Sequence, residues 1–355
     1  MNVQLDNFQN LIDTIKLYGD KLQDYQLECR QSFPTENGEL AEAIINRIKS
    51  DNDIPFYFET QPKNVSRLSY ILPNRIATAF NYETNRMRLD VIKGGMSELT
   101  PKKNVKNMFC RGIKLDGAGQ FWGGNPNWSL VRTVKIKNPI SQNKEIVASI
   151  VYSPQDRTLF YSIDGESFSI FKNNPPIKMN IKNIDIDAAL IHADHRIEIE
   201  PVKIKAHLGN HHRGPATLSK CLFQEQLGRR LHLSFQDLSS MNYPLCLMAQ
   251  GVLGVVYIGS AESNLKNCSA GIFIAENAGY SVSAFHTSSK TGLDKMQNRR
   301  LCSVIGSQPQ LHSICLDSYK RATTNPISDI GIVSVAKRPN FKLLSTTEKI
   351  NLVYL

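Results

Sequence analysis

The chain has 355 residues, a formal net charge of +10 and an isoelectric point near 9.2. Its apolar fraction of 41% and charged fraction of 21% are typical of a folded globular protein, so the composition excludes a disordered chain. No apolar run approaches the ~18 residues of a membrane span, and we expect none. The positive charge favours acidic partners, but no nucleic-acid-binding motif accompanies it.

The seven cysteines show no regular spacing, which argues against a disulfide framework, a zinc ribbon or a redox-active CxxC pair. A reducing compartment therefore fits the chain best. The first residues lack a charged segment followed by an apolar core, so we expect no secretory signal peptide. The cytoplasm is then the expected place of action, and a toxin delivered by a needle apparatus would have the same features.

Apolar residues recur at helical spacing from Phe8 to Tyr25, with Gly19 as a weak point in the pattern. A second helical pattern begins near Thr35 or Asn37 and ends before Pro55. We therefore expect residues 1–55 to form an N-terminal helical segment. It either packs on the following domain or docks a chaperone or another partner.

Strand-like alternation dominates the rest of the chain, which favours sheets with one solvated face. We predict an α+β fold with a central β-sandwich flanked by helices over residues 56–355, and a functional core within 216–355. The predicted strands are 86–92, 130–136, 145–152, 159–163, 330–335 and 349–354, and the predicted helix is 216–227.

Two further patterns predict no cofactor. The glycine-rich stretch 117–124 fits neither a phosphate-binding P-loop nor a dinucleotide fingerprint, so we interpret it as a packed loop anchored by Trp122 and Trp128. Five histidines cluster without a metalloprotease motif or paired cysteines, and we expect them to be solvated loop residues rather than a metal site. They are His192, His195, His207, His211 and His212.

A cysteine and a histidine provide the most informative pattern in the chain. Cys268 precedes the strand-like run 272–275, a four-residue turn follows at 276–279, and His286 lies in the next strand-like run, 280–287. A hairpin of this form would bring the two side chains to the same end of a sheet. The imidazole could then take the proton of the thiol and later return it to a leaving amine.

The peptide groups beside this thiol are candidates for a supporting role. The backbone N–H groups at Asn267 and Ser269 could stabilise a developing oxyanion, provided that they lie ~3 Å from it. The catalytic candidates are therefore Cys268 and His286. The oxyanion candidates are Asn267 and Ser269, the two residues beside Cys268 in the chain.

The order of parts in this segment resembles the cytotoxic necrotizing factor type of glutamine deamidase toxins. That family carries a strand, a turn ending in cysteine, an apolar strand, a Gly-Tyr turn and a strand ending in His-Thr. The corresponding pieces here are Val256–Gly259, Asn264–Cys268, Ile272–Ala275, Gly279–Tyr280 and Phe285–Thr287.

The resemblance implies a secreted effector, a virulence toxin that hydrolyses a glutamine side-chain amide of a host protein. The implied target is a small Rho-type GTPase. Cys268 would form a thioester and His286 would act as base and then acid, and an amine in place of water would give transglutamination. A main-chain carbonyl in the strand around Leu233 would orient the histidine.

Two alternatives stay open at this point. In effector-type acyltransferases and proteases the histidine lies upstream of a cysteine at a helix start, and His207, Glu225 and Cys268 have a tolerable spacing for that order. In the other alternative the chain is a non-enzymatic basic binding or scaffold protein, in which Cys268 is a small buried hydrophobic residue.

Overall fold

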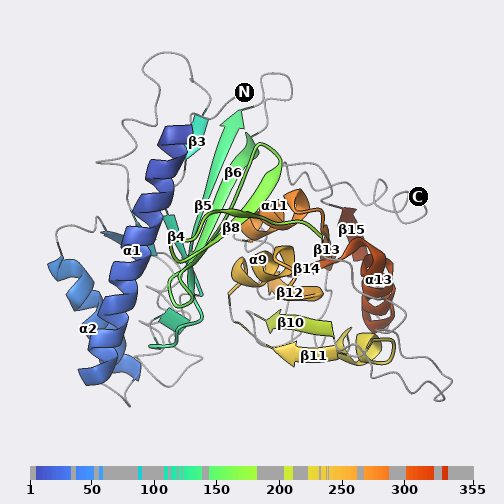
Figure 1. Cartoon of the computed structure of the whole chain (residues 1–355). Coiled ribbons are helices and arrows are strands. Elements are labelled where there is room, and N and C mark those ends of the chain that lie inside the picture. The colour runs from blue at the N-terminus through green and yellow to red at the C-terminus, as the bar shows by residue number, and fades with distance from the viewer. Residues whose placement is uncertain are drawn as a thin grey trace. The chain divides into compact units, whose positions relative to one another are not determined.

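Helices come first in the chain and strands follow, as the hydrophobic spacing predicts (Figure 1). Helix α1 spans Leu5–Ser32 and α2 spans Asn37–Ser50, so the predicted helical segment is present. The structure is a computed structural model that describes residues 5–32, 37–51, 56–58, 87–89, 108–110, 113–117, 120–121, 123–137, 144–181, 204–210, 223–231, 233–236, 238, 240–261, 268–287, 301–323 and 330–334. The predicted strand 349–354 and the start of the predicted helix 216–227 lie outside these residues.

The chain divides into two compact units. Unit 1 comprises Met1–Phe160 and Ile170–Pro176, and unit 2 comprises Tyr161–Ser169 and Ile177–Leu355. The mixture of helices with antiparallel and mixed sheets confirms the α+β class. The β-sandwich and the predicted domain boundary after residue 55 stay predictions.

A nine-stranded sheet runs through unit 1 and into the first residues of unit 2. Its strands lie in the order β1, β2, β4, β5, β6, β7, β8 and β9, and β3 pairs with β5. Every pair of this sheet whose register is described is antiparallel. The strands are β1 (Phe56–Phe58), β2 (Met87–Leu89), β3 (Met108–Cys110), β4 (Ile113–Asp116), β5 (Ser129–Lys137), β6 (Lys144–Ser153), β7 (Thr158–Ile163), β8 (Glu166–Phe171) and β9 (Ile177–Lys178).

Helix α1 packs on β5 and β6 with an apolar stripe that includes the fully buried Ile15 and Leu22. Gly19, which weakens the helical pattern in the sequence, lies where α1 comes closest to β6. A Cβ atom at Gly19 would lie 2.5 Å from the Cδ1 atom of Tyr152. The glycine therefore permits the close packing of this helix on the sheet, which is the packing role expected for the segment.

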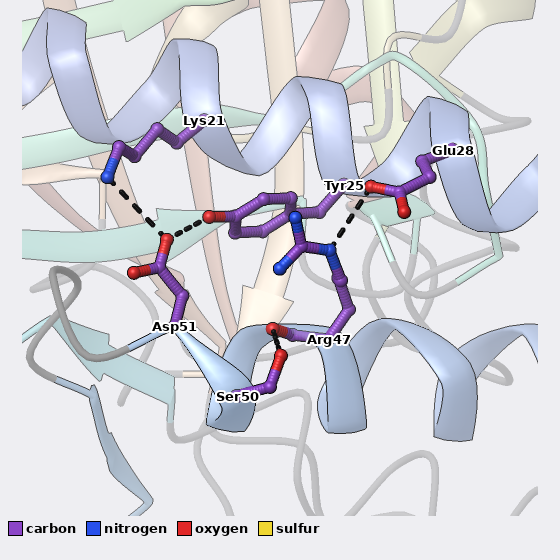
Figure 2. A network of polar contacts seen from close by, with 6 residues as sticks. All are labelled: Lys21, Tyr25, Glu28, Arg47, Ser50 and Asp51. Atoms are coloured by element: carbon purple, nitrogen blue, oxygen red, sulfur yellow. Dashed lines mark hydrogen bonds and ion pairs between the residues drawn. The ribbon is translucent and has the colours of Figure 1, made fainter.

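Polar contacts between the two helices join α2 to α1 (Figure 2). The Tyr25 hydroxyl donates a hydrogen bond to Asp51, and the Lys21 ammonium lies 3.6 Å from the same carboxylate. The Arg47 guanidinium covers the Tyr25 ring at 4.3 Å and donates to Glu28 at 3.1 Å. The tyrosine is thus fixed at its ring face and at its hydroxyl, which orients α2 against α1.

Unit 2 is built on a six-stranded mixed sheet in the order β11, β10, β12, β14, β13 and β15. Strand β10 pairs in parallel with β11 and β12, and the remaining pairs are antiparallel. The elements are β10 (Ile204–Asn210), β11 (Leu233–Gln236), α9 (Tyr243–Ala249), β12 (Val255–Ala261), α11 (Ser269–Asn277), β13 (Ser281–Thr287), β14 (Leu301–Ser307), α13 (Pro309–Thr323) and β15 (Ile330–Ser334).

A predicted strand proves to be a helix. Residues 272–275 were expected to form the first arm of a hairpin, but they belong to α11, which ends at Asn277. Most of the residues of α11 are small or apolar, and most of them are buried, so the helix has core contacts around nearly its whole circumference. A short apolar run of this kind has no periodicity that separates a buried strand from a buried helix. The second predicted arm is confirmed as β13.

Candidate functional site

Cys268 lies at the N-cap position of α11, in the interior of unit 2. Its carbonyl accepts the N–H of Ile272 at 3.0 Å, which closes the first turn of the helix. Within the same first turn, the Asn242 side chain accepts the N–H of Gly271 at 2.9 Å. A Cβ atom at Gly271 would lie only 2.7 Å from the backbone oxygen of Asn242. The start of α11 is therefore tightly packed against the start of α9.

The thiol of Cys268 has no exposed surface. A glutamine of a protein substrate cannot approach an atom that is completely covered, so the proposed thioester chemistry has no access to its nucleophile. The strand-turn-strand geometry expected around Cys268 and His286 is also wrong, because the cysteine begins a helix. His286 lies on β13, where it pairs with Cys302 of β14 and Gly331 of β15, and its side chain lies outside the described residues.

The supporting candidates are dispersed through unit 2. Ser269 is the first residue of α11 and is buried, whereas Leu233 begins β11 and packs against the core of the unit. Asn267 lies outside the described residues. Ser269 and Leu233 are therefore supplied by different elements.

The alternative with an upstream histidine is contradicted by the positions of Cys268 and of its proposed acid, Glu225. His207 lies on β10, and Glu225 lies on the short helix 223–228. The side chain of Glu225 is half-exposed and forms an ion pair with Arg229, one turn away. Cys268 does begin a helix, as this alternative expects, but its burial excludes it as an acyl acceptor.

A buried polar chain in unit 2 was not foreseen from the sequence. The Nε2 atom of His312 on α13 lies 2.8 Å from the Ser283 hydroxyl, and its Nδ1 atom lies 2.8 Å from the Ser307 hydroxyl. Burial lowers the pKa of His312 to about 4, so the ring is neutral near pH 7. The Cys315 thiol bonds to Ser307, and burial raises its pKa to about 12.

This chain of hydrogen bonds connects α13 to β13 and β14. Both serines are buried, so the imidazole serves to satisfy polar groups inside the core. The serines and the histidine come from three separate elements. Their proximity was therefore not visible as a motif.

Unit 1 carries a second polar group that sequence reasoning missed, at the carboxyl end of β4. Asp116 is the last residue of the strand and is 7% exposed. Gly117 follows with φ of +77°, and a Cβ atom there would lie 2.7 Å from the backbone oxygen of Asn127. The chain therefore turns away from the sheet directly after a buried carboxyl group, in a conformation that favours glycine.

Ser129 lies opposite Asp116 in the antiparallel register of β4 and β5. Residues that face each other in this way place their side chains on the same face of the sheet, with Cβ atoms about 5 Å apart. The Ser129 side chain is completely buried, and among the described residues its Oγ atom has no hydrogen-bond partner. A carboxyl group and an unused hydroxyl group thus lie side by side at the end of two strands.

The loop that follows Asp116 is held in place by α1. The Gln26 amide group donates to the carbonyls of Phe121 at 2.6 Å and Asn125 at 3.1 Å. Its oxygen accepts the indole N–H of Trp128 at 3.1 Å, and the ring of Trp128 meets that of Phe121 edge to face. The expectation of a packed loop anchored by Trp128 is confirmed. Trp122 lies outside the described residues.

Asp116, Ser129 and the described loop residues 117, 120–121 and 123–128 are defined here as the Asp116 site. Its polar side chains are preorganised because they lie on strands, and because α1 donates hydrogen bonds to three carbonyls of the neighbouring loop, those of Phe121, Gly124 and Asn125. The signal that could have found it is the glycine-rich stretch, which begins one residue after the aspartate. Among the described residues, no group of three histidine, cysteine, aspartate or glutamate side chains could together hold a metal ion.

The chain was compared with protein-family models and with curated protein sequences, and neither comparison gives a match. Within the described part of the chain, no helix is both long enough and apolar enough to cross a bilayer.

Several solved structures share part of the arrangement. Mycobacterium tuberculosis SuhB is 16% identical with a TM-score of 0.44, over 61% of this chain and 72% of that chain. The Thermotoga maritima IMPase is 16% identical with a TM-score of 0.42, over 60% and 69%. CysQ from Bacteroides thetaiotaomicron, a bacterial member of the inositol monophosphatase family, is 13% identical with a TM-score of 0.40, over 81% and 93%.

The resemblance to the cytotoxic necrotizing factor type of deamidase toxins is wrong, because the segment expected to form its turn and apolar strand forms the start of helix α11. None of the three similar structures named above is described as a deamidase toxin. The predicted deamidase and transglutaminase activities, and the role of Cys268 as their nucleophile, depended on this resemblance and are wrong as well. The host GTPase partner and the role of secreted effector rested on the same resemblance and have no support in the structure. With TM-scores below 0.5, these neighbours do not by themselves assign a family to the chain.

Proposed function

We propose that the chain is a hydrolase that removes phosphate from a small phosphate ester at the Asp116 site. The observation that carries this proposal is the buried carboxyl group of Asp116 beside the unused hydroxyl group of Ser129. Burial of a hydroxyl group without a hydrogen-bond partner is unfavourable for the fold alone. Binding of a polar substrate would give the Ser129 hydroxyl group a hydrogen-bond partner beside the Asp116 carboxyl group, which gives its position a reason.

The charge of the protein supports a phosphate as the substrate group. A net charge of +10 attracts an anionic ester to the surface and raises its local concentration. At the reacting phosphorus, a carboxylate acts either as a base toward the attacking water or as an oxygen ligand for a divalent cation. The Ser129 hydroxyl would donate a hydrogen bond to a phosphate oxygen.

The loop of the Asp116 site supports the same proposal. Two side chains of α1 donate hydrogen bonds to carbonyls of this loop. Gln26 donates to two of them, and Arg30 donates to the carbonyl of Gly124 at 3.1 Å. A loop whose backbone is fixed in this way keeps its shape when a substrate binds, so little ordering is needed at that moment. Loops of this kind on rigid scaffolds are common positions of functional residues.

The test is the release of inorganic phosphate by the purified chain. The substrates are p-nitrophenyl phosphate and a panel of sugar and inositol monophosphates, each assayed with Mg²⁺ and with a chelator. We expect Asp116→Asn to lower kcat/KM by about 10² to 10⁴, the range measured for loss of a catalytic acid or base. A requirement for Mg²⁺ that is weakened in Asp116→Asn would support a role of Asp116 as a cation ligand, and activity in chelator would support its role as a base.

One control variant and a second site variant separate loss of function from loss of stability. Asp164→Asn changes an exposed aspartate in the turn between β7 and β8, and should leave phosphate release unchanged. Ser129→Ala removes a buried hydroxyl that has no partner among the described residues, so the fold should be as stable or about 1 kcal/mol more stable, while activity falls. Equal phosphate release by Asp116→Asn and the unchanged chain would exclude the Asp116 site as the active site.

The cytoplasm is the compartment that we propose for this activity. Four described cysteines, Cys29, Cys246, Cys268 and Cys315, are free and buried. Free thiols in the interior suit a reducing compartment.

A further inference from the structure

The C-terminal end of α11 is held by the first residues of unit 2, which form the connection between β7 and β8. The Ser167 hydroxyl donates to the carbonyl of Ile274 at 2.7 Å, and the same carbonyl also accepts the backbone N–H of Ala278 at 3.1 Å. The Asn277 amide donates to the Ser162 hydroxyl at 2.7 Å, which in turn donates to the carbonyl of Glu166 at 2.9 Å. Two side-chain contacts thus join the helix end to the hairpin.

Glu276 lies between the two bonded residues of α11. Its Oε1 atom is buried and, in the part of the chain that the structure describes, has no hydrogen-bond partner. Burial raises the pKa of Glu276 from 4.5 to about 8. A carboxylate in this position would be an uncompensated charge, so the closed arrangement favours the neutral carboxylic acid.

No neighbouring charge accounts for this preference, because burial alone causes the rise in the pKa. Glu166 in the hairpin is already paired with Lys178 on β9. Asp164 lies exposed at the tip of the hairpin. The elements that contact α11 carry few titratable residues. They are Tyr243 and Cys246 on α9, Tyr161 on β7, Glu166 on β8 and, in the sequence of β13, His286.

We propose that the C-terminal end of α11 is a proton-controlled latch, closed on the β7–β8 hairpin while the Glu276 carboxyl group carries a proton and released when the proton leaves. On release the hydrogen bonds to Ser162 and Ser167 break, and the carboxylate reaches water. The latch is independent of the reaction proposed for the Asp116 site.

The sign of the pH dependence follows from the two states. In the open state Glu276 ionises near its ordinary pKa of 4.5, whereas in the closed state it ionises only at about 8. Between these values the open state has one proton fewer, so its population rises about tenfold per pH unit. Above the upper value both states are ionised and the dependence ends.

Hydrogen exchange read by mass spectrometry tests the latch on the full-length chain. We compare pH 5.5 with pH 7.5 and correct each rate for the intrinsic chemistry of exchange. The peptide that covers α11 from residue 270 to 280 should exchange about 100-fold faster at the higher pH, relative to that correction. The variant Glu276→Gln cannot ionise, so its corrected rate should be the same at both pH values.

Ser167→Ala tests the hydrogen bonds that hold the latch closed, separately from the protonation of Glu276. It removes one of the two contacts, so corrected exchange of the same peptide should rise at both pH values while the hundredfold ratio persists. A flat corrected rate in the unchanged chain would overturn the latch. The same rise in Glu276→Gln, or no change of exchange in Ser167→Ala, would also overturn it.

Discussion

The indole N–H of Trp128 donates a hydrogen bond of 3.1 Å to the side-chain oxygen of Gln26, a residue of the N-terminal helix. The same Gln26 side chain donates to two carbonyls of the loop that begins after Asp116. One buried amide group therefore satisfies one donor and two acceptors of the loop. The N-terminal helix thereby supports the geometry of the Asp116 site, in addition to covering the sheet.

Replacement of Gln26 should destabilise the protein strongly. Gln26→Met has a similar size but leaves the Trp128 indole and the carbonyls of Phe121 and Asn125 without this partner. We expect the free energy of unfolding to fall by about 2 to 4 kcal/mol, measured by urea denaturation. Gln9→Met is the control, because Gln9 bonds only to the exposed Asp13 on the same helix, and its effect should stay below about 0.5 kcal/mol.

Gly19 should not tolerate a methyl group. In Gly19→Ala the new Cβ atom would lie 2.5 Å from the Tyr152 ring, so α1 and β6 must move apart. We expect a loss of roughly 1 to 3 kcal/mol in the free energy of unfolding, the usual range for overpacking. Gly228→Ala offers the contrast: no atom lies within 4 Å of the added Cβ, and thermal unfolding should show no loss of stability.

Acid should weaken the contact that His312 makes between α13 and the sheet. The pKa of His312 is about 4 in the folded protein and about 6.5 in the unfolded chain, so the unfolded chain binds the additional proton in this window. Stability is therefore unaffected above pH 6.5 and falls by about 1 kcal/mol per unit as the pH drops toward 4.

Urea denaturation of the unchanged chain and of His312→Gln at pH 5, 6 and 7 checks this dependence. The variant is less stable at pH 7 because it loses a hydrogen bond, but its stability should depend less on pH. Parallel pH profiles for the two proteins would show that the His312 ring does not titrate between these states.

Cys268 should be inert in the native protein. A fully buried thiol at a packed helix start is out of reach of iodoacetamide, and the nucleophile is the thiolate rather than the thiol. Peptide mapping after brief labelling should find Cys268 unmodified in buffer and fully modified in concentrated urea. Rapid labelling of Cys268 in the native state would contradict its burial.

Local patterns in the sequence were sufficient for many of the elements. The helical spacing of α1 and α2 and the alternation of β5, β6 and β7 predicted those elements, since each depends on which side chains face the core. The run 272–275 was assigned to a strand because a helix buried on nearly all sides has no polar face to reveal its period. The predicted hairpin, and with it the pairing of Cys268 with His286, depended on that one assignment.

By itself the sequence determined the α+β class, the helical start of the chain, most of the long strands and the packed glycine-rich loop. Only the tertiary structure decided which polar groups meet. Asp116 and Ser129 become neighbours through strand register, and Ser283, Ser307 and His312 become neighbours through helix docking. The physical reason is that periodicity encodes which face of an element is buried, whereas contacts between distant residues depend on how elements pair and pack.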